Sequence, residues 1–201
     1  MRMNLLGRWI LNSPQRVFVQ RHHLLPTFLH LGGPLYGCHV LEVGCGRGAG
    51  IQLISQVGAA RVDGVDLDPV MAGLAKRRLG PRALVAVADI AALPMPDSSY
   101  DAVIDFGAIH LMPEWRTGIG EVARVLRPGG RFLFEQPAHP LYRRLMPLST
   151  GRQIPGGFSR DSFLAELHHH GLQLVGLARP HPLILSGVLG DLVGVSRKVV
   201  G

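Results

Sequence analysis

The stretch "VLEVGCGRGAG", residues 40–50, decides the fold class of this 201-residue chain. Its first four residues read as a buried strand, and glycine then takes every second position, at Gly44, Gly46, Gly48 and Gly50. Glycine in such a run costs backbone entropy and adds no side chain to a core, so the pattern predicts that something approaches the backbone closely. A phosphate, an amino-acid moiety or a tight turn would each account for it.

Strands and helices alternate along the rest of the sequence. Apolar, β-rich runs predict strands at residues 38–43, 60–68, 82–89, 100–107, 131–136, 172–178 and 191–199. Cap and breaker residues predict helices at residues 13–33, 48–58, 69–80, 113–126 and 159–171. This alternation is typical of a doubly wound α/β fold with right-handed crossovers and helices on both faces. We therefore expect a Rossmann-like sheet of about seven strands, mostly parallel with the last strand antiparallel. An N-terminal helical cover, kinked by Pro26, should precede it.

The composition is that of one globular domain. Apolar residues make up 47% of the chain and charged residues 17%, which excludes a disordered protein. The two cysteines, Cys38 and Cys45, flank one predicted strand, so we expect neither a disulfide nor a zinc site from them. Residues 1–14 are too polar for a signal peptide and residues 181–196 too interrupted for a membrane span, so we expect a cytoplasmic protein.

The formal net charge of the chain is +7, but its basic residues are scattered rather than gathered into a tract with interleaved aromatic residues. Nucleic-acid binding is therefore disfavoured, and a neutral or acidic small molecule is the expected partner. The sequence leaves two further interactions open: peripheral contact with a membrane surface through the apolar N-terminal segment, and homodimer formation.

In a doubly wound sheet, ligands bind beyond the carboxyl ends of the strands, where the glycine loop is expected to lie. The helix that follows the loop offers unpaired N–H groups to an anion. Asp66 follows Gly44 by 22 residues and ends the second predicted strand, where its carboxylate can accept from two ribose hydroxyls. These features predict a cofactor that contains a nucleoside.

The glycine loop and Asp66 are compatible with more than one class of nucleoside-containing cofactor. Gly44, Gly46 and Ala49 match a permitted form of the dinucleotide fingerprint, so a nicotinamide-dependent dehydrogenase is one alternative. Glu42 argues against it, because that fingerprint normally has an apolar residue at this point of the strand. A second acid, Asp89, ends the third predicted strand. A P-loop is excluded because no Gly-Lys-Ser/Thr follows the glycines.

Five segments occur in order along the chain: "VLEVGCGRGAG", "VDGVDLDPVM", "VADIAALPMPDSSYDAVID", "GAIHLMPEW" and "EVARVLRPGGRFLFEQ". In order and spacing, this set resembles the class I S-adenosylmethionine-dependent methyltransferases, and among them the small-molecule branch that includes the ubiquinone and menaquinone methyltransferases. The resemblance covers about residues 38–136, and the C-terminal helix and strands also fit. It implies S-adenosylmethionine as the methyl donor, S-adenosylhomocysteine as a product and a small-molecule acceptor.

The resemblance also implies ten cofactor-binding residues: Glu42, Gly44, Cys45, Gly46, Gly48, Asp66, Leu67, Asp89, Ile90 and Phe106. The glycines of the loop would pack under the methionine moiety, with Glu42 near its amino group. Phe106, at the end of the fourth predicted strand, would adjoin the reacting methyl group.

The adenosine moiety would lie at the ends of the second and third strands. The resemblance implies that Asp66 binds the ribose hydroxyls and that Leu67 lies against the adenine ring. Asp89 would accept from the adenine amino group, while the Ile90 N–H would donate to the ring. Two of these residues also have a structural interpretation: Leu67 as ordinary core, and Glu42 as a satisfied buried acid.

Methyl transfer from a sulfonium is an in-line displacement, in which positioning alone contributes ~7–11 kcal/mol. A base is needed only where the acceptor arrives protonated. His110, which follows the fourth predicted strand, is the first candidate, either as a base or as a pocket residue. Glu135 and His139, near the end of the fifth strand, are weaker candidates, and Glu135 would equally pair with a nearby arginine.

The run His168-His169-His170 resembles a metal-binding tract. Consecutive residues of a helix, however, point about 100° apart, so we expect no metal site there. When protonated, these histidines would instead interact favourably with the negative end of the helix dipole at the C-terminus.

The expected domain division is residues 1–33 as a cover of the acceptor pocket and residues 34–201 as the cofactor-binding domain, with 136–160 as a substrate-side insertion. Both flanking segments are rich in apolar residues, which predicts a largely apolar acceptor: a phenol, a quinone precursor, a lipid-like molecule or a secondary-metabolite scaffold. Their arginines would hold an acidic group of the acceptor or be solvated: Arg16, Arg21, Arg143 and Arg144. A non-catalytic binding or scaffold protein with the same fold stays open as an alternative, as does the dehydrogenase.

Overall fold

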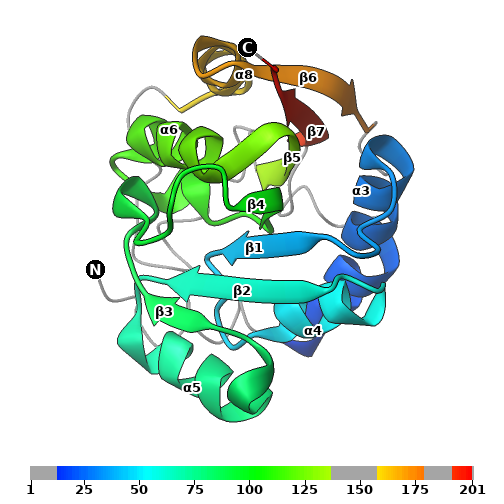
Figure 1. Ribbon diagram of the computed structural model, residues 1–201, viewed down its shortest axis with the longest axis vertical. Coiled ribbons are helices and arrows are strands. Elements are labelled where there is room, and N and C mark those ends of the chain that lie inside the picture. The colour runs from blue at the N-terminus through cyan, green and yellow to red at the C-terminus, as the bar shows by residue number, and fades with distance from the viewer. Residues whose placement is uncertain (1–12, 137–157, 179–191, 201) are drawn as a thin grey trace.

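The computed structural model describes residues 13–136, 158–178 and 192–200, which fold around one twisted sheet (Figure 1). Among these residues the sheet has seven strands, in the order β3-β2-β1-β4-β5-β7-β6. Their bounds are β1 His39–Val43, β2 Arg61–Asp66, β3 Val85–Val87, β4 Tyr100–Asp105, β5 Leu126–Gln136, β6 Leu172–Leu177 and β7 Leu192–Lys198. All pairs among β1 to β5 are parallel, and β7 runs antiparallel to both of its neighbours. The predicted doubly wound sheet with an antiparallel last strand is confirmed.

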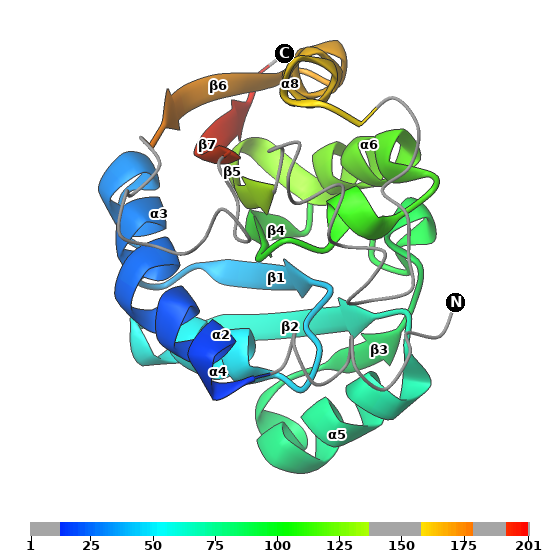
Figure 2. The ribbon, with the colours of Figure 1, turned by 180° about the vertical axis from the view of Figure 1, so that it is seen from behind.

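The helices cover both faces of the sheet (Figures 1 and 2). They are α2 Pro14–Val19, α3 Leu25–Gly32, α4 Ala49–Gln56, α5 Pro69–Leu79, α6 Trp115–Val125 and α8 Arg160–His169, with short turns η2 Gly80–Arg82, η3 Ile90–Ala92 and η4 Ile109–Leu111. Alternate residues of β1 enter two separate apolar clusters. Leu41 packs with Trp115 and other side chains of α6 and α8, whereas Val40 packs with Phe28 of α3 and with side chains of α4 and α5. A central strand buried on both faces explains why "VLEV" is apolar almost throughout.

The N-terminal helix is interrupted before Pro26 rather than at it. A π-helical turn, η1 Gln20–Leu24, separates α2 from α3, and Pro26 lies in the first turn of α3. Proline is tolerated there because the first N–H groups of a helix have no intrahelical partner. Its ring clashes with the carbonyl four residues earlier in a regular α-helix, which accounts for the wider turn just upstream.

Two strands differ in length from the predicted ones. β5 begins at Leu126 instead of residue 131, because Leu126 pairs with Tyr100 before a bulge shifts the register to Arg131 beside Ala102. The "RPGG" segment, predicted as a loop, is therefore part of an irregular strand. β3 is shorter than predicted, since it lies at the edge of the sheet and pairs only with β2.

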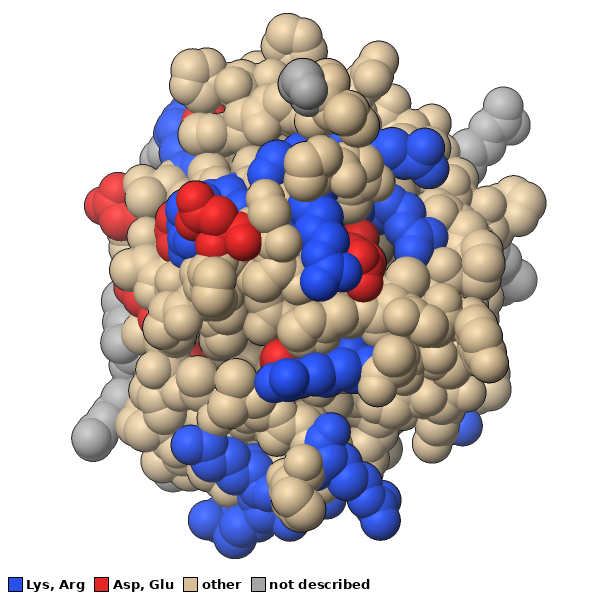
Figure 3. Space-filling view, viewed as in Figure 1, with Lys and Arg blue, Asp and Glu red and all other residues tan. Residues whose placement is uncertain are grey.

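Charge is unevenly distributed on the face in Figure 3, where basic and acidic side chains are mixed over the upper part and basic side chains predominate at the lower end. That end is formed by α5, whose last turn carries Lys76, Arg77 and Arg78. In the described ranges, no helix is long and apolar enough to cross a membrane.

Candidate active site

The strand order reverses between β1 and β4, and a cavity of about 490 Å³ opens at the carboxyl ends of β1 to β4. Such a reversal is where ligands bind in open α/β sheets. Nine of the ten predicted cofactor-binding residues line this cavity: Glu42, Gly44, Cys45, Gly46, Asp66, Leu67, Asp89, Ile90 and Phe106. The topology therefore brings together residues that are up to 64 positions apart in the sequence, from Glu42 to Phe106.

The glycine loop is shaped by close packing between elements. Gly44 has φ +70°, and a Cβ there would overlap the side chain of Ala108, which directly precedes η4. A Cβ on Gly50, in the first turn of α4, would overlap the Glu42 carboxylate. Gly48 lies outside the cavity lining and faces α5, where a Cβ would come within 2.9 Å of Leu79. The glycines thus let three elements meet around the cavity, and Gly48 has a packing role that the sequence did not indicate.

Glu42 is the most unusual group of the cavity. Its side chain is 2% exposed, and its carboxylate accepts from the Ile51 N–H at the start of α4. Its Oε2 atom has no hydrogen-bond partner among the described residues. Burial, together with the nearby negative charges of Asp66 and Asp105, raises the pKa of Glu42 well above its ordinary value. A buried acid of this kind needs a cation or a donor, so it fits the α-ammonium group of an amino-acid moiety.

Asp66 joins the end of β2 to the glycine loop. Its Oδ2 accepts from the Gly46 N–H at 2.8 Å, and its Oδ1 accepts from the Asp68 N–H at 2.8 Å. The carboxylate lines the cavity, and since it is a pure acceptor when ionised, it suits hydroxyl donors of a ligand there. Asp68 caps α5 by accepting from the Val70 N–H, as its position before Pro69 predicted.

The end of β3 supplies the other predicted adenine contacts. Asp89 is exposed, and its Oδ1 accepts from the Ala91 N–H, which caps the short turn η3. Ile90 is buried, while Leu67 is half-buried and lies in neither apolar cluster. Leu67 is therefore part of the cavity wall rather than the core.

The end of β4 is anchored to the N-terminal helix. Arg16 is 8% exposed, and it donates to the Phe106 carbonyl at 2.6 Å and to both oxygens of the buried Glu135 carboxylate. The structure thus places Glu135 in an ion pair, one of its two predicted interpretations, and outside the cavity lining. Arg16 lines the cavity and is buried, so the prediction that it is solvated is wrong, while its contact with an acidic group of the acceptor stays a prediction.

His110 lies behind the cavity wall. It is 2% exposed, its backbone N–H donates to the Gln136 side-chain oxygen at 3.2 Å, and it is not among the residues that line the cavity. Burial, with a smaller contribution from the Arg16 charge, lowers the pKa of His110 to about 3. In this position the imidazole is neutral at physiological pH and too weakly basic to take a proton efficiently. His139, Arg143 and Arg144, with most of the predicted insertion and residues 1–12, lie outside the described residues.

Sequence reasoning missed a buried polar network beside His110. Asp105 accepts from the Ala108 and Ile109 N–H groups and from the side chain of Gln136. Burial raises the pKa of Asp105 to about 7. The signal was present, because Asp105 interrupts the apolar run "VIDF", and an acid is buried among apolar residues only where it has partners. Val17, Gln20, Leu111 and Met112, which also line the cavity, carry no such signal.

A doubly wound sheet with acids near the ends of β1, β2 and β3, around one cavity, defines a protein of the nucleoside-cofactor-binding Rossmann type. Comparison with known proteins gives the class within that type. Residues 41–134 match the family described as "Methyltransferase domain". This match confirms the predicted resemblance to class I S-adenosylmethionine-dependent methyltransferases.

Individual relatives agree with this class. The chain is 35% identical over 143 residues to a probable S-adenosylmethionine-dependent methyltransferase of Mycolicibacterium smegmatis, covering 71% of this chain and 52% of that protein. It is 41% identical over 108 residues to a fatty-acid O-methyltransferase of the same organism, covering 53% of this chain and 39% of that protein. The chain thus spans about half the length, or less, of these curated relatives.

Among solved structures, the fold is similar to that of a putative methyltransferase from Haloferax volcanii in complex with the Trm112 methyltransferase activator. The TM-score is 0.78 at 18% identity, with 100% of both chains covered. At this level of identity the likeness shows the shared fold.

Proposed function

We propose that this chain transfers a methyl group from S-adenosylmethionine to a largely apolar, lipid-like small molecule. The observation that carries the proposal is the convergence of Glu42, Asp66 and Asp89, near the ends of three adjacent strands, on one cavity. The family match of residues 41–134 supports the same donor.

The residues of the cavity suit the parts of this cofactor. Glu42, with its unpartnered buried oxygen, would hold the positively charged amino group. Asp66 would accept from the ribose hydroxyls, while Leu67 and Ile90 would enclose the adenine ring and Asp89 would accept from its amino group. The narrow glycine loop would exclude water from the methionine moiety.

When bound, the cofactor supplies an electrophilic methyl group on a sulfonium sulfur: a bond from the acceptor forms as the carbon–sulfur bond breaks, and that electron pair stays on sulfur. The protein must then hold the acceptor in line with the methyl group. Phe106, Leu111 and Met112, from the segment after β4, give this end of the cavity an apolar wall, with Val17 from α2. Such a wall favours an apolar acceptor.

No histidine is among the described residues that line the cavity. An acceptor that arrives already ionised, such as a fatty-acid carboxylate or a phenolate, needs no base. The apolar part of such a molecule suits this wall. The fatty-acid O-methyltransferase among the relatives supports an acceptor of this chemistry. We also propose that residues 1–33 cover the acceptor end of the cavity, because Arg16, Val17 and Gln20 line it.

A labelled-methyl transfer assay tests the proposal. The chain is incubated with methyl-labelled S-adenosylmethionine and, in separate reactions, a long-chain fatty acid, an alkylphenol and a small polar amine. We expect label in the fatty-acid ester or the aryl ether and none in the amine. Asp66→Ala should abolish transfer, while the control Asp97→Ala, at an exposed acid away from the cavity, should not. Cofactor binding without transfer to any acceptor would instead support the non-catalytic alternative.

A further inference from the structure

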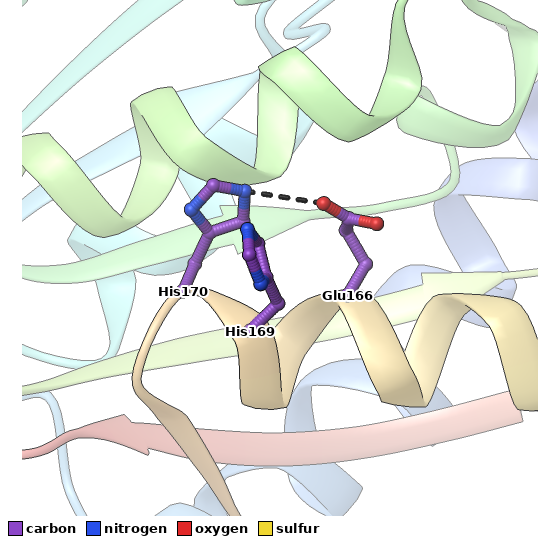
Figure 4. Close-up of side chains that lie close together, drawn as sticks. All are labelled: Glu166, His169 and His170. Atoms are coloured by element: carbon purple, nitrogen blue, oxygen red, sulfur yellow. Dashed lines mark ion pairs between the residues drawn. The ribbon is translucent and has the colours of Figure 1, made fainter.

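A second cluster of polar side chains lies on α8, whose residues do not line the cavity described above. Glu166, His169 and His170 each offer one ligand atom, and these atoms lie within 4.8 Å of one another. Glu166 Oε1 and His170 Nε2 are 3.2 Å apart. Figure 4 shows the three side chains on one side of the helix, with the carboxylate and the His170 ring joined across the last turn.

The end of the helix explains why two consecutive histidines converge. α8 ends at His169, and His170 is the C-cap residue, with φ −93° and ψ 17°, outside the regular helix. The separation of about 100° between consecutive residues of a regular helix therefore does not apply to His169 and His170. Their ring centroids lie 4.9 Å apart. His170 also lies four residues after Glu166, on the next turn of the same face. The expectation that this histidine run diverges is thus wrong for His169 and His170, and the exposed His168 is not in the cluster.

Neighbouring residues of α6 hold the cluster in place. Arg116 Nε lies 3.2 Å from Glu166 Oε2, which leaves Oε1 directed at the imidazole. The Arg116 guanidinium also lies 4.3 Å from the centroid of the Trp115 ring. Gly120 leaves space for the His170 ring, because a Cβ there would come within 2.9 Å of His170 Cε1. Metal-binding side chains are held in orientation by neighbouring groups in this way.

We propose that Glu166, His169 and His170 bind a divalent transition-metal ion of the zinc type. Two imidazoles and one carboxylate form a donor set that suits Zn²⁺, with a fourth position left for water. Tetrahedral ligand atoms 2.0–2.1 Å from zinc are about 3.4 Å apart. The Glu166–His170 pair is close to that spacing, at 3.2 Å, and the exposed His169 would have to rotate to complete the set. The ion would join the last turn of α8 to its cap beside α6.

Calorimetric titration of the full chain with Zn²⁺, after dialysis against a chelator, tests this site. We expect one ion per chain in the wild type, and an affinity at least about tenfold weaker in each of Glu166→Gln, His169→Ala and His170→Ala. His168→Ala is the matched control, because it removes a histidine of the same helix that is outside the cluster, and its affinity should equal that of the wild type. Circular dichroism checks that each variant is folded.

A second measurement separates this site from binding elsewhere on the chain. Zn²⁺ should raise the Tm of the wild type and of His168→Ala, and it should raise the Tm of the ligand variants less at the same concentration, because only a bound ion stabilises the folded state. Absence of zinc binding by the wild type would overturn the proposal. So would wild-type affinity in Glu166→Gln and His170→Ala, or a loss of affinity in His168→Ala.

Discussion

At the scale of single residues, Glu42 carries the largest part of the functional argument. A buried carboxylate with an unpartnered oxygen costs folding free energy, and its raised pKa reports that cost. A cation bound in the cavity beside Glu42 would offset this free-energy cost. The sequence alone could single out Glu42, because an acid between Leu41 and Val43 interrupts an otherwise apolar strand.

The substitution Glu42→Gln tests this role. Glutamine has nearly the same size and can still accept from the Ile51 N–H, but it cannot offer a charge to an ammonium group. We expect the binding free energy of S-adenosylhomocysteine to weaken by about 1.5–3 kcal/mol, which is the contribution of a hydrogen bond to a charged group. Glu114→Gln, an exposed acid outside the cavity, is the control. Equal affinity of Glu42→Gln and the wild type would contradict the assignment.

At the scale of elements, a buried ion pair anchors the first N-terminal helix, α2, to the sheet. Arg16 on α2 reaches Glu135 at the end of β5, 119 residues away, and also the Phe106 carbonyl beyond β4. No sequence pattern links residues so far apart, which is why the pairing of Arg16 could not be predicted although α2 itself was. The same limit applies to the bulge in β5, since it depends on the register with β4.

Removing Arg16 should therefore destabilise the protein. Arg16→Met leaves the Glu135 carboxylate buried without its cation, so we expect a loss of about 3–5 kcal/mol in the free energy of unfolding. Adding Glu135→Gln should recover part of that loss. Arg21→Met, on the same helical segment but exposed, should change stability by less than about 0.5 kcal/mol. Urea unfolding of the four proteins measures this, and a loss in Arg16→Met no larger than in Arg21→Met would refute the anchor.

The network at the ends of β4 and β5 should respond to pH in two opposed ways. Asp105 has its pKa raised from 3.8 to about 7, so its contribution to stability falls as pH rises through that range. His110 has its pKa lowered from 6.5 to about 3, so its contribution rises as pH rises from 3 to 6.5. Each slope is about 1.4 kcal/mol per pH unit, and the two cancel where the ranges overlap.

Substitution of either residue should expose the slope of the other. Between pH 4.5 and 6, Asp105→Asn should gain stability relative to the wild type as pH rises, by about 1.4 kcal/mol per unit. His110→Gln should lose stability relative to the wild type at the same rate. Denaturant unfolding at several pH values gives these differences. If the free energy of unfolding of both variants changed with pH in the same way as that of the wild type, neither group would have the shifted pKa.

At the scale of the whole molecule, the doubly wound topology is what assembles the site. Strand order and crossovers bring the ends of β1, β2, β3 and β4 to one edge of the sheet, so acids spaced along the sequence meet around one cavity. Periodicity and breaker residues were sufficient to predict the alternating strands and helices, because these follow from local patterns and general rules of handedness. The full set of cofactor-binding residues was predicted from the family resemblance. The cluster of Glu166, His169 and His170 was not predictable in this way, since it depends on where the last turn of α8 ends.

The central claim is that this cavity binds an S-adenosyl cofactor rather than a nicotinamide dinucleotide. Calorimetric titration of the wild-type chain with S-adenosylhomocysteine, and separately with NADH, tests that claim most directly. We predict a one-site isotherm for S-adenosylhomocysteine and no measurable heat of binding for NADH. Binding of NADH, with none of S-adenosylhomocysteine, would contradict the account.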